Sequence, residues 1–231
     1  MVERQVPLQK LLDDLQSAIT SGRERTWAAR CAHALGLEGI AVSLLRGAEL
    51  VWFSDEISAR LEDVQFTLGQ GPGLSADFGF DAVPYQVPEV HGLDAEQWPQ
   101  FVIEAEKLGV EAVFVWPVRV GSASIGTLTG YRTSPGPLTE RQAADGLLVA
   151  DVLAGQVLAW QPQAPASDDG PGTTGTVDLH RVEVHQATGV LSVRLGVPVA
   201  EALLRLRAQA FAAGRPLHEV AREIIDEALP T

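Results

Sequence analysis

The sequence predicts an α+β domain, in which an antiparallel sheet is flanked by helices, followed by a separate all-α bundle of three helices. Three observations predict this. The longest strand-like stretch is interrupted once, at Gly121-Ser122-Ala123, as in a hairpin. Residues 181–229 instead place apolar residues at helical spacing. Residues 161–176, between the two, are rich in Pro, Gly, Ser and Thr and cannot bury apolar surface. We therefore expect a domain over 1–160, a linker over 161–176 and the bundle over 177–231.

The first half of the domain is predicted to hold a helix, a hairpin and a second helix. Apolar residues at helical spacing predict one helix over 6–36, which a glycine ends. Strand-type residues at 39–45 and 49–54 are separated by a short turn, which predicts a hairpin. A second helix is expected over 55–67, with Ser54 as its cap.

The second half continues the same alternation of strands and helices, so that the sheet is layered with helices. The expected elements are a Gly/Pro loop at 68–74, a strand at 83–87, a helix from Asp94 to Leu108, hairpin strands at 110–120 and 124–131, and a long apolar helix from Thr139 to Trp160.

The C-terminal bundle has clear helix ends. Gly196 and Gly214 can take the left-handed conformation that ends a helix, and Pro198 and Pro216 suit the first turn of the next one. Each helix is predicted to bury one apolar face. The residues of these faces are Val184, Ala187 and Leu191 in the first helix, Leu203, Leu206, Ala210 and Phe211 in the second, and Leu217, Val220, Ala221, Ile224 and Ile225 in the third.

The same helices carry a series of separate sequence anchors. They are Arg181, Gln186-Ala187-Thr188-Gly189-Val190-Leu191, Gly196, Glu201-Ala202, Leu206-Arg207 and Leu217-His218-Glu219-Val220-Ala221. In this order they resemble the ANTAR domain, a bacterial three-helix module. Many members carry Lys before the glycine of the first helix, where this chain has Thr188. The resemblance implies binding to paired RNA hairpins, which prevents transcription termination.

An arginine face accompanies this resemblance. Arg181, His185 and Thr188 are expected on one face of the first helix, opposite Val184 and Leu191. Arginine can pair with phosphate at two points or stack on an unpaired base. An amphipathic helix with ordinary solvated polar residues is the alternative. The RNA-binding candidates are Arg181, His185, Gln186, Thr188, Arg194, Arg205, Arg207 and Arg215.

The charge balance limits how strongly this chain can bind RNA. The formal net charge is −13 over 231 residues. Residues 177–231 hold 6 Arg and 7 Asp or Glu, a balance of −1. Because a basic excess is missing, we expect RNA binding that rests on a local arginine face and is modest and salt-sensitive.

A second resemblance covers roughly residues 8–160. The motifs Leu68-Gly69-x-Gly71-Pro72 and Gly126-x-Leu128, in this order of elements, are similar to those of GAF domains, which are sensory modules. Members often have Cys after the Gly-Pro pair, where this chain has Gly73, so no thiol chemistry is expected there. GAF followed by ANTAR is a familiar bacterial arrangement.

The resemblance to GAF domains implies a ligand pocket between sheet and helices. Its candidate lining is Trp52, Phe66, Phe78, Phe114, Trp116 and Tyr131; an ordinary core is the alternative interpretation of these residues. The loop from Gly69 to Gly73 could cradle a phosphate, but it lacks the Lys-Ser/Thr ending of a P-loop, so a tight connection is favoured. The ligand, and whether there is one, stays open, and no cofactor is assigned.

No catalytic or metal site is expected. Cys31 falls on a helical apolar stripe and is expected to be a buried hydrophobe. His33 and His91 have no second histidine at ligand spacing. The N-terminal stretch lacks the apolar core of a signal peptide, and no run approaches the ~18 apolar residues of a membrane span. We expect a cytoplasmic protein that is not an enzyme and does not contact a membrane.

The expected function is that of a sensory antiterminator that binds paired RNA stem-loops as a homodimer. The apolar stripes of the first helix and of residues 147–160 are expected to form the dimer. The main alternative is a ligand or redox sensor whose C-terminal bundle binds a protein partner. A DNA-binding helix-turn-helix and a GAF-fold enzyme are weaker alternatives.

Overall fold

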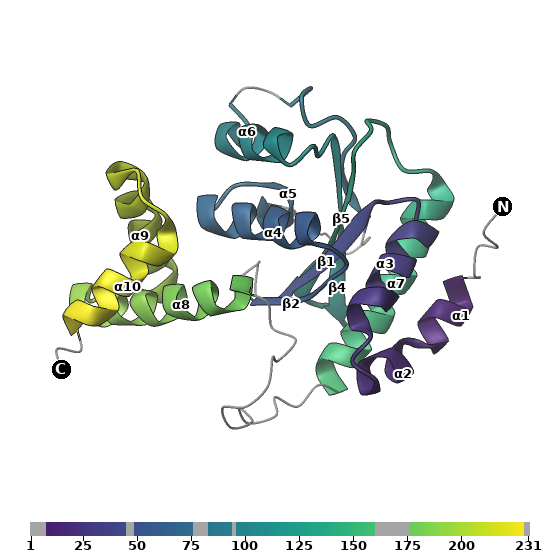
Figure 1. Ribbon diagram of the computed structural model, residues 1–231, viewed down its shortest axis with the longest axis horizontal. Helices are drawn as coiled ribbons and strands as arrows, with labels where there is room; N and C mark the ends of the chain where they lie inside the picture. Colours follow the sequence, from purple (N-terminus) through teal and green to yellow (C-terminus); the bar gives the residue numbers. More distant parts are fainter. Residues whose placement is uncertain (1–7, 45–48, 76–82, 94–95, 160–175, 229–231) are drawn as a thin grey trace. The chain divides into compact units, whose positions relative to one another are not determined.

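The computed structural model describes residues 8–44, 49–75, 83–93, 96–159 and 176–228 (Figure 1). The chain divides into two compact units, one holding residues 1–66 and 70–170 and the other residues 67–69 and 171–231. The predicted linker over 161–176 lies outside the described residues, except for Thr176, which is the first residue of a helix.

The N-terminal unit is built on one antiparallel sheet with the strand order β2-β1-β5-β4-β3. Both predicted hairpins are confirmed, because β1 pairs with β2 and β4 with β5. The strands are β1 (Gly39–Leu44), β2 (Glu49–Phe53), β3 (Tyr85–Val87), β4 (Ala112–Val120) and β5 (Ala123–Arg132).

One face of the sheet is covered by α3 (Glu24–Ala34) and α7 (Glu140–Ala159) (Figure 1). The helices α1 (Leu8–Asp13) and α2 (Leu15–Thr20) pack on the outer side of this layer, and their buried residues join the same apolar core. Thr139, where α7 was expected to begin, is its cap: the Thr139 hydroxyl accepts the Gln142 N–H at 3.2 Å, and the Thr139 N–H donates to Gln142 Oε1 at 3.0 Å.

The prediction of a single helix over 6–36 is wrong. The described part of this segment forms three helices, and Gly22, with φ of 64°, redirects the chain between α2 and α3. Trp27 Nε1 then donates to the Leu11 carbonyl, which holds α3 against α1. Apolar spacing predicted the buried stripe correctly, but a glycine inside it allowed the chain to fold back.

The other face of the sheet carries α4 (Glu56–Leu68), α5 (Pro72–Ser75) and α6 (Pro99–Lys107) (Figure 1). Three predictions need correction here. Asp55, not Ser54, caps α4, because Asp55 Oδ1 accepts the Ser58 N–H at 2.9 Å. Part of the predicted 68–74 loop is the short helix α5. The helix expected from Asp94, which lies outside the described residues, begins at Pro99, after Trp98 in the left-handed conformation (φ of 54°).

The C-terminal unit consists of the three predicted helices, α8 (Thr176–Leu195), α9 (Val199–Ala213) and α10 (Leu217–Ala228). Gly196 and Gly214, at φ of 63° and 61°, end α8 and α9 as expected. The predicted fold class is therefore confirmed: an antiparallel sheet with helices, followed by an all-α bundle. Within the described chain no single helix is long and apolar enough to cross a membrane, although Arg181–Leu195 and Val199–Ala213, bent by 107°, pass such a test as a pair.

Candidate functional site

The three C-terminal helices share one small core. Nine of the twelve predicted core residues are fully buried, and Leu203 and Ile225 are partly buried. Phe211 is the exception: it is 74% exposed, so its prediction as a core residue is wrong. It follows Ala210 on α9, and Ala202, Leu206 and Ala210 already fill the inward stripe of this helix.

The junction of α8 and α9 sets the shape of the bundle. The Ser192 hydroxyl donates to the Val197 carbonyl at 2.7 Å, across the left-handed Gly196. The second helix then starts at Val199, directly after Pro198. This turn gives the 107° bend, so the outward faces of the two helices point in different directions.

Two of the predicted RNA-contacting residues are buried. Arg181 is 2% exposed and Thr188 is 1% exposed. The Thr188 hydroxyl donates to the Val184 carbonyl one turn earlier, at 2.6 Å. The expectation that these two side chains lie opposite Val184 is wrong, because positions 181, 184 and 188 are three and four residues apart and share one side of a helix. Arg181 and Thr188 therefore belong to the interior of the unit.

The solvent side of α8 carries other candidates. His185 and Gln186 are exposed, and the next turn holds the exposed Gly189. A Cβ at Gly189 would meet nothing within 4 Å, so packing inside the unit does not require a glycine at this position. Because glycine has no side chain, nothing projects from the surface of α8 here. This side of α8 is open and has few charges.

The remaining candidate arginines take part in ion pairs or other contacts. Arg194 Nη1 lies 3.2 Å from Glu227 Oε2, which joins the end of α8 to α10. Arg205 pairs with Glu201 one turn earlier on α9. Arg207, also on α9, is partly exposed. Pairing with carboxylates means that phosphate has to compete for Arg194 and Arg205.

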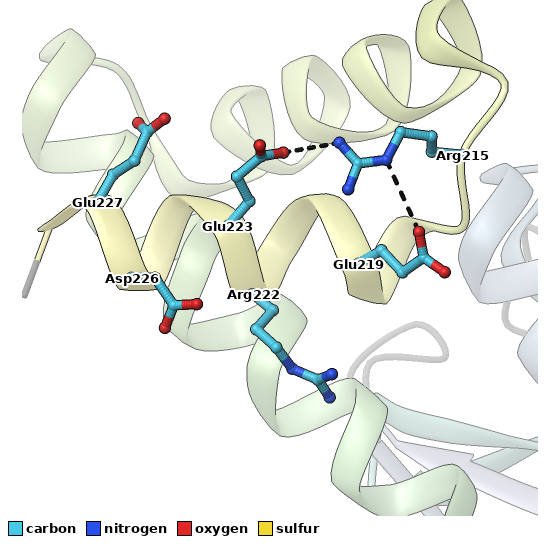
Figure 2. Close-up of a pocket in the computed structure, with 6 residues that line it drawn as sticks. All are labelled: Arg215, Glu219, Arg222, Glu223, Asp226 and Glu227. Carbon is cyan, nitrogen blue, oxygen red and sulfur yellow. Dashed lines mark hydrogen bonds and ion pairs between the residues drawn. The ribbon is translucent and has the colours of Figure 1, made fainter.

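Arg215 lies in a strongly acidic surface pocket on α10 (Figure 2). Its Nη1 is 2.7 Å from Glu223 Oε2, and its Nε is 3.7 Å from Glu219 Oε2. The bond to Glu223 raises the pKa of Arg215 above its ordinary value. Asp226 and Glu227 line the same pocket, so four carboxylates and two arginines face this surface, which disfavours a phosphate there.

Arg222 was not among the predicted site residues. Its Nη2 donates to Glu183 Oε1 at 2.8 Å, and this bond raises the pKa of Arg222. The two residues are 39 positions apart, so no local spacing in the sequence could have indicated the pair. In the C-terminal unit, Arg215 and Arg222 therefore lie in the acidic pocket of α10, whereas Arg205 and Arg207 lie on α9.

The predicted aromatic pocket of the N-terminal unit does not form as one site. Phe114 and Trp116 belong to the apolar core under α3 and α7, and Trp52 packs against the same core. Phe66 lies on α4, which covers the opposite face, and Tyr131, an odd-numbered residue of β5, faces away from Phe114 and Trp116. Tyr131 donates to Asp55 Oδ1 at 3.1 Å. Phe78 lies outside the described residues.

The other candidate groups have plain structural roles. The Gly73 N–H donates to Gln65 Oε1 at 2.7 Å, so this backbone donor of the glycine loop already has a hydrogen-bond acceptor within the protein. His91 Nδ1 lies 3.0 Å from Glu111 Oε2, and His91 Nε2 lies 3.4 Å from Glu106 Oε1. Cys31 is fully buried, which raises the pKa of its thiol to about 12. Among the residues that the structure describes, no group of three potential metal ligands comes together.

Comparison with known families identifies the C-terminal helices. Residues 179–225 match the family model of the ANTAR domain. This segment contains the described part of all three helices except their outermost turns. The predicted ANTAR resemblance is confirmed. A search of the curated proteins finds no match.

Solved structures similar to this chain include sensory and enzymatic proteins. One is free methionine-R-sulfoxide reductase from Neisseria meningitidis with its substrate, at 17% identity and a TM-score of 0.46, covering 69% of this chain and 93% of that one. Another is the GAF domain of a phosphoenolpyruvate-protein phosphotransferase from Coxiella burnetii, at 13% identity and a TM-score of 0.44, covering 68% of this chain and 96% of that one. At these scores the likeness assigns neither a ligand nor an activity to the N-terminal unit.

Proposed function

We propose that this chain is a cytoplasmic transcription regulator whose ANTAR domain binds paired RNA stem-loops and prevents transcription termination. The match of residues 179–225 to the ANTAR family carries the proposal. The three-helix core supports it, because the residues that form the family pattern are the ones that position α8, α9 and α10.

The RNA-binding surface in this proposal lies on α8 and α9, not on α10. His185 and Gln186 are exposed on α8, and Arg205 and Arg207 are the basic residues of α9. The surface pocket of α10 contains four carboxylates and two arginines that pair with carboxylates. A phosphate backbone is repelled by such a surface at moderate salt.

The proposed mechanism is stabilisation of the stem-loops against an overlapping terminator hairpin. A homodimer would present two RNA surfaces by symmetry, one for each loop. The dimer interface predicted from the apolar stripes needs revision, because Leu11, Leu15 and Leu153 are buried inside the N-terminal unit. The N-terminal unit, as a sensor, would control the pairing or the exposure of the ANTAR domains.

Fluorescence anisotropy of the full chain with a labelled two-hairpin RNA tests the binding step. The controls are the same RNA with scrambled loops and a matched DNA duplex. We expect loop-dependent binding whose affinity falls with salt at a slope of about −3, as for roughly two phosphate contacts in each bundle of the dimer. Arg207→Ala should weaken binding and reduce the magnitude of that slope by about 1.5, because one contact is lost in each bundle. Equal binding of all three nucleic acids would contradict the proposal.

A protein partner is the second candidate function. Val193, Leu204 and Phe211 are 86%, 64% and 74% exposed on α8 and α9. Exposed apolar side chains of this size are typical of interaction surfaces when they are contiguous. If Phe211→Ser abolishes a protein complex while Arg207→Ala leaves it intact, this second function is favoured over RNA binding.

A further inference from the structure

Phe211 on α9 is the one aromatic side chain of the described residues that lies exposed on the surface. It is 74% exposed, whereas every other Phe, Tyr and Trp that the structure describes is buried or partly buried. It is also the only residue of these three types within residues 177–231. An aromatic ring stabilises a fold mainly when it is removed from water, so the bundle gains little stability from its single ring.

The neighbours of Phe211 on α9 leave its ring uncovered. Side chains three and four residues apart on a helix lie beside each other. Ala208, three residues earlier, is exposed and has only a methyl group. Gly214, three residues later, ends α9, and a Cβ built on it would meet nothing within 4 Å. The ring therefore stands beside open space, in which a flat group can lie against it.

The segment around Phe211 carries positive charge and no negative charge. Residues 202–218 contain Arg205, Arg207 and Arg215 but no Asp or Glu, in a chain whose formal net charge is −13. Arg207 lies one turn before Phe211 on α9, so the two side chains share a face of the helix. Arg215 is instead oriented toward two carboxylates of α10. Arg207 is therefore the arginine that accompanies the ring.

An unpaired nucleotide matches both of these groups. Bases in RNA loops are splayed out and stack on aromatic side chains, while basic residues hold the phosphates of the same strand. An apolar side chain of a protein partner would match the Phe211 ring but would leave the charge of Arg207 unused. The pairing of an exposed ring with a neighbouring arginine therefore favours RNA over a protein at this point of α9.

We propose that Phe211 stacks on an unpaired loop base of the RNA while Arg207 pairs with a phosphate beside that base. The inference rests on the proposed RNA binding and assigns it a residue that selects loops over duplex. A base in a paired stem is already stacked on both sides and cannot lie against the ring. Because every base has a π-face, this contact selects for an unpaired nucleotide and not for one particular base.

Fluorescence anisotropy of the full chain with the labelled two-hairpin RNA tests the stacking contact. Phe211→Leu keeps an apolar side chain but removes the ring, and we expect it to weaken binding at least about tenfold. Phe211→Trp keeps a stacking surface and should bind within about threefold of the wild type. The matched control is Leu204→Ala, at a position of α9 that is 64% exposed, which should bind like the wild type.

The salt dependence separates stacking from charge. Phe211→Leu should leave the slope of affinity against salt unchanged, because no phosphate contact is lost. Arg207→Ala should reduce the magnitude of that slope. Both variants should keep the Tm of the wild type within about 2 °C, since neither side chain belongs to the buried stripe of α9.

Replacing one loop nucleotide at a time by an abasic one identifies the stacked base. At that position the wild type should lose at least about tenfold in affinity, and Phe211→Leu should lose nothing further, because both changes remove the same contact. At the other loop positions the two losses should add. Additive losses at every position would overturn the inference.

The remaining outcomes are equally distinct. If Phe211→Leu binds the RNA as tightly as the wild type, the stacking inference falls and the proposed RNA binding stands. If Phe211→Leu and Leu204→Ala weaken binding to the same extent, this face of α9 contacts a protein, such as a second copy of the chain, and not a base. If the wild type shows no loop-dependent binding, the proposed function and this inference fall together.

Discussion

Arg222 donates two hydrogen bonds to a single carboxylate oxygen of Glu183, at 3.2 Å from Nε and 2.8 Å from Nη2. This contact joins α10 to α8 across the bundle. It also assigns Arg222 a structural role, since its guanidinium is oriented toward Glu183. The basic residues of the ANTAR domain therefore cannot be treated as one RNA-binding set.

Arg222→Met should lower the melting temperature, because the substitution keeps the aliphatic stem but removes both hydrogen bonds. The loss should shrink when ionic strength is raised from about 0.05 M to about 0.5 M, since salt screens an exposed pair. Glu183→Gln should behave in the same way, and the double variant should lose less than the sum of the two. Additive losses would show that the two side chains do not interact.

Arg181→Ala should destabilise the protein by about 2 kcal/mol or more, because the side chain is buried inside the unit. Arg205→Ala, at an exposed position, should cost at most about 0.5 kcal/mol. Urea unfolding measures both values. A small loss for Arg181→Ala would contradict its interior role and restore it as a candidate RNA contact.

Phe211→Ser should change the free energy of unfolding by no more than about 0.5 kcal/mol, because the ring is exposed. Leu206→Ala, five residues earlier and fully buried, should cost about 2–5 kcal/mol. The comparison separates the inward from the outward side of α9. Similar losses in the two variants would place Phe211 in a core.

The stability of the N-terminal unit should fall as pH rises above 9. Burial raises the pKa of Cys31 from 9.0 to about 12. Because the folded state favours the protonated thiol, its contribution is complete below pH 9 and is lost between about pH 9 and 12, a loss on the order of 4 kcal/mol. Burial and the neighbouring Asp55 also raise the pKa of Tyr131, so its contribution falls in the same direction.

Cys31→Ala isolates the thiol from the tyrosine. The variant should lose less stability than the wild type over the same alkaline range, as measured by urea unfolding at each pH. The native thiol should also resist alkylation at pH 8, because a buried thiol gives little thiolate. Rapid labelling of the native wild type would contradict the burial of Cys31.

Helix spacing and Gly/Pro punctuation predicted most of the architecture. Gly196-Val197-Pro198 and Gly214-Arg215-Pro216 separate three helices in the structure as they do in the sequence pattern. Conversely, the turn at Gly22 was not visible in the sequence, because the residues on both sides of it belong to one apolar stripe and join the same core. Periodicity reports which side is buried, not whether the helix is continuous.

The candidate sites were harder to predict because they depend on pairs that are distant in sequence. Arg181 and Thr188 were placed on the solvent side although helical geometry puts them beside Val184. The Arg222–Glu183 bond joins two helices across 39 positions, and no local pattern marks it. The sequence therefore indicated the type of each residue but not its partner.

Single-round transcription in vitro tests the central claim most directly. The template encodes two adjacent hairpins, the second of which overlaps an intrinsic terminator, and the control template has scrambled loops. We predict that the full chain increases readthrough on the first template only, and that Arg207→Ala reduces the effect while Arg222→Met, once shown to be folded, does not. If the chain binds the RNA but readthrough stays unchanged on both templates, the account of this protein as an antiterminator is contradicted.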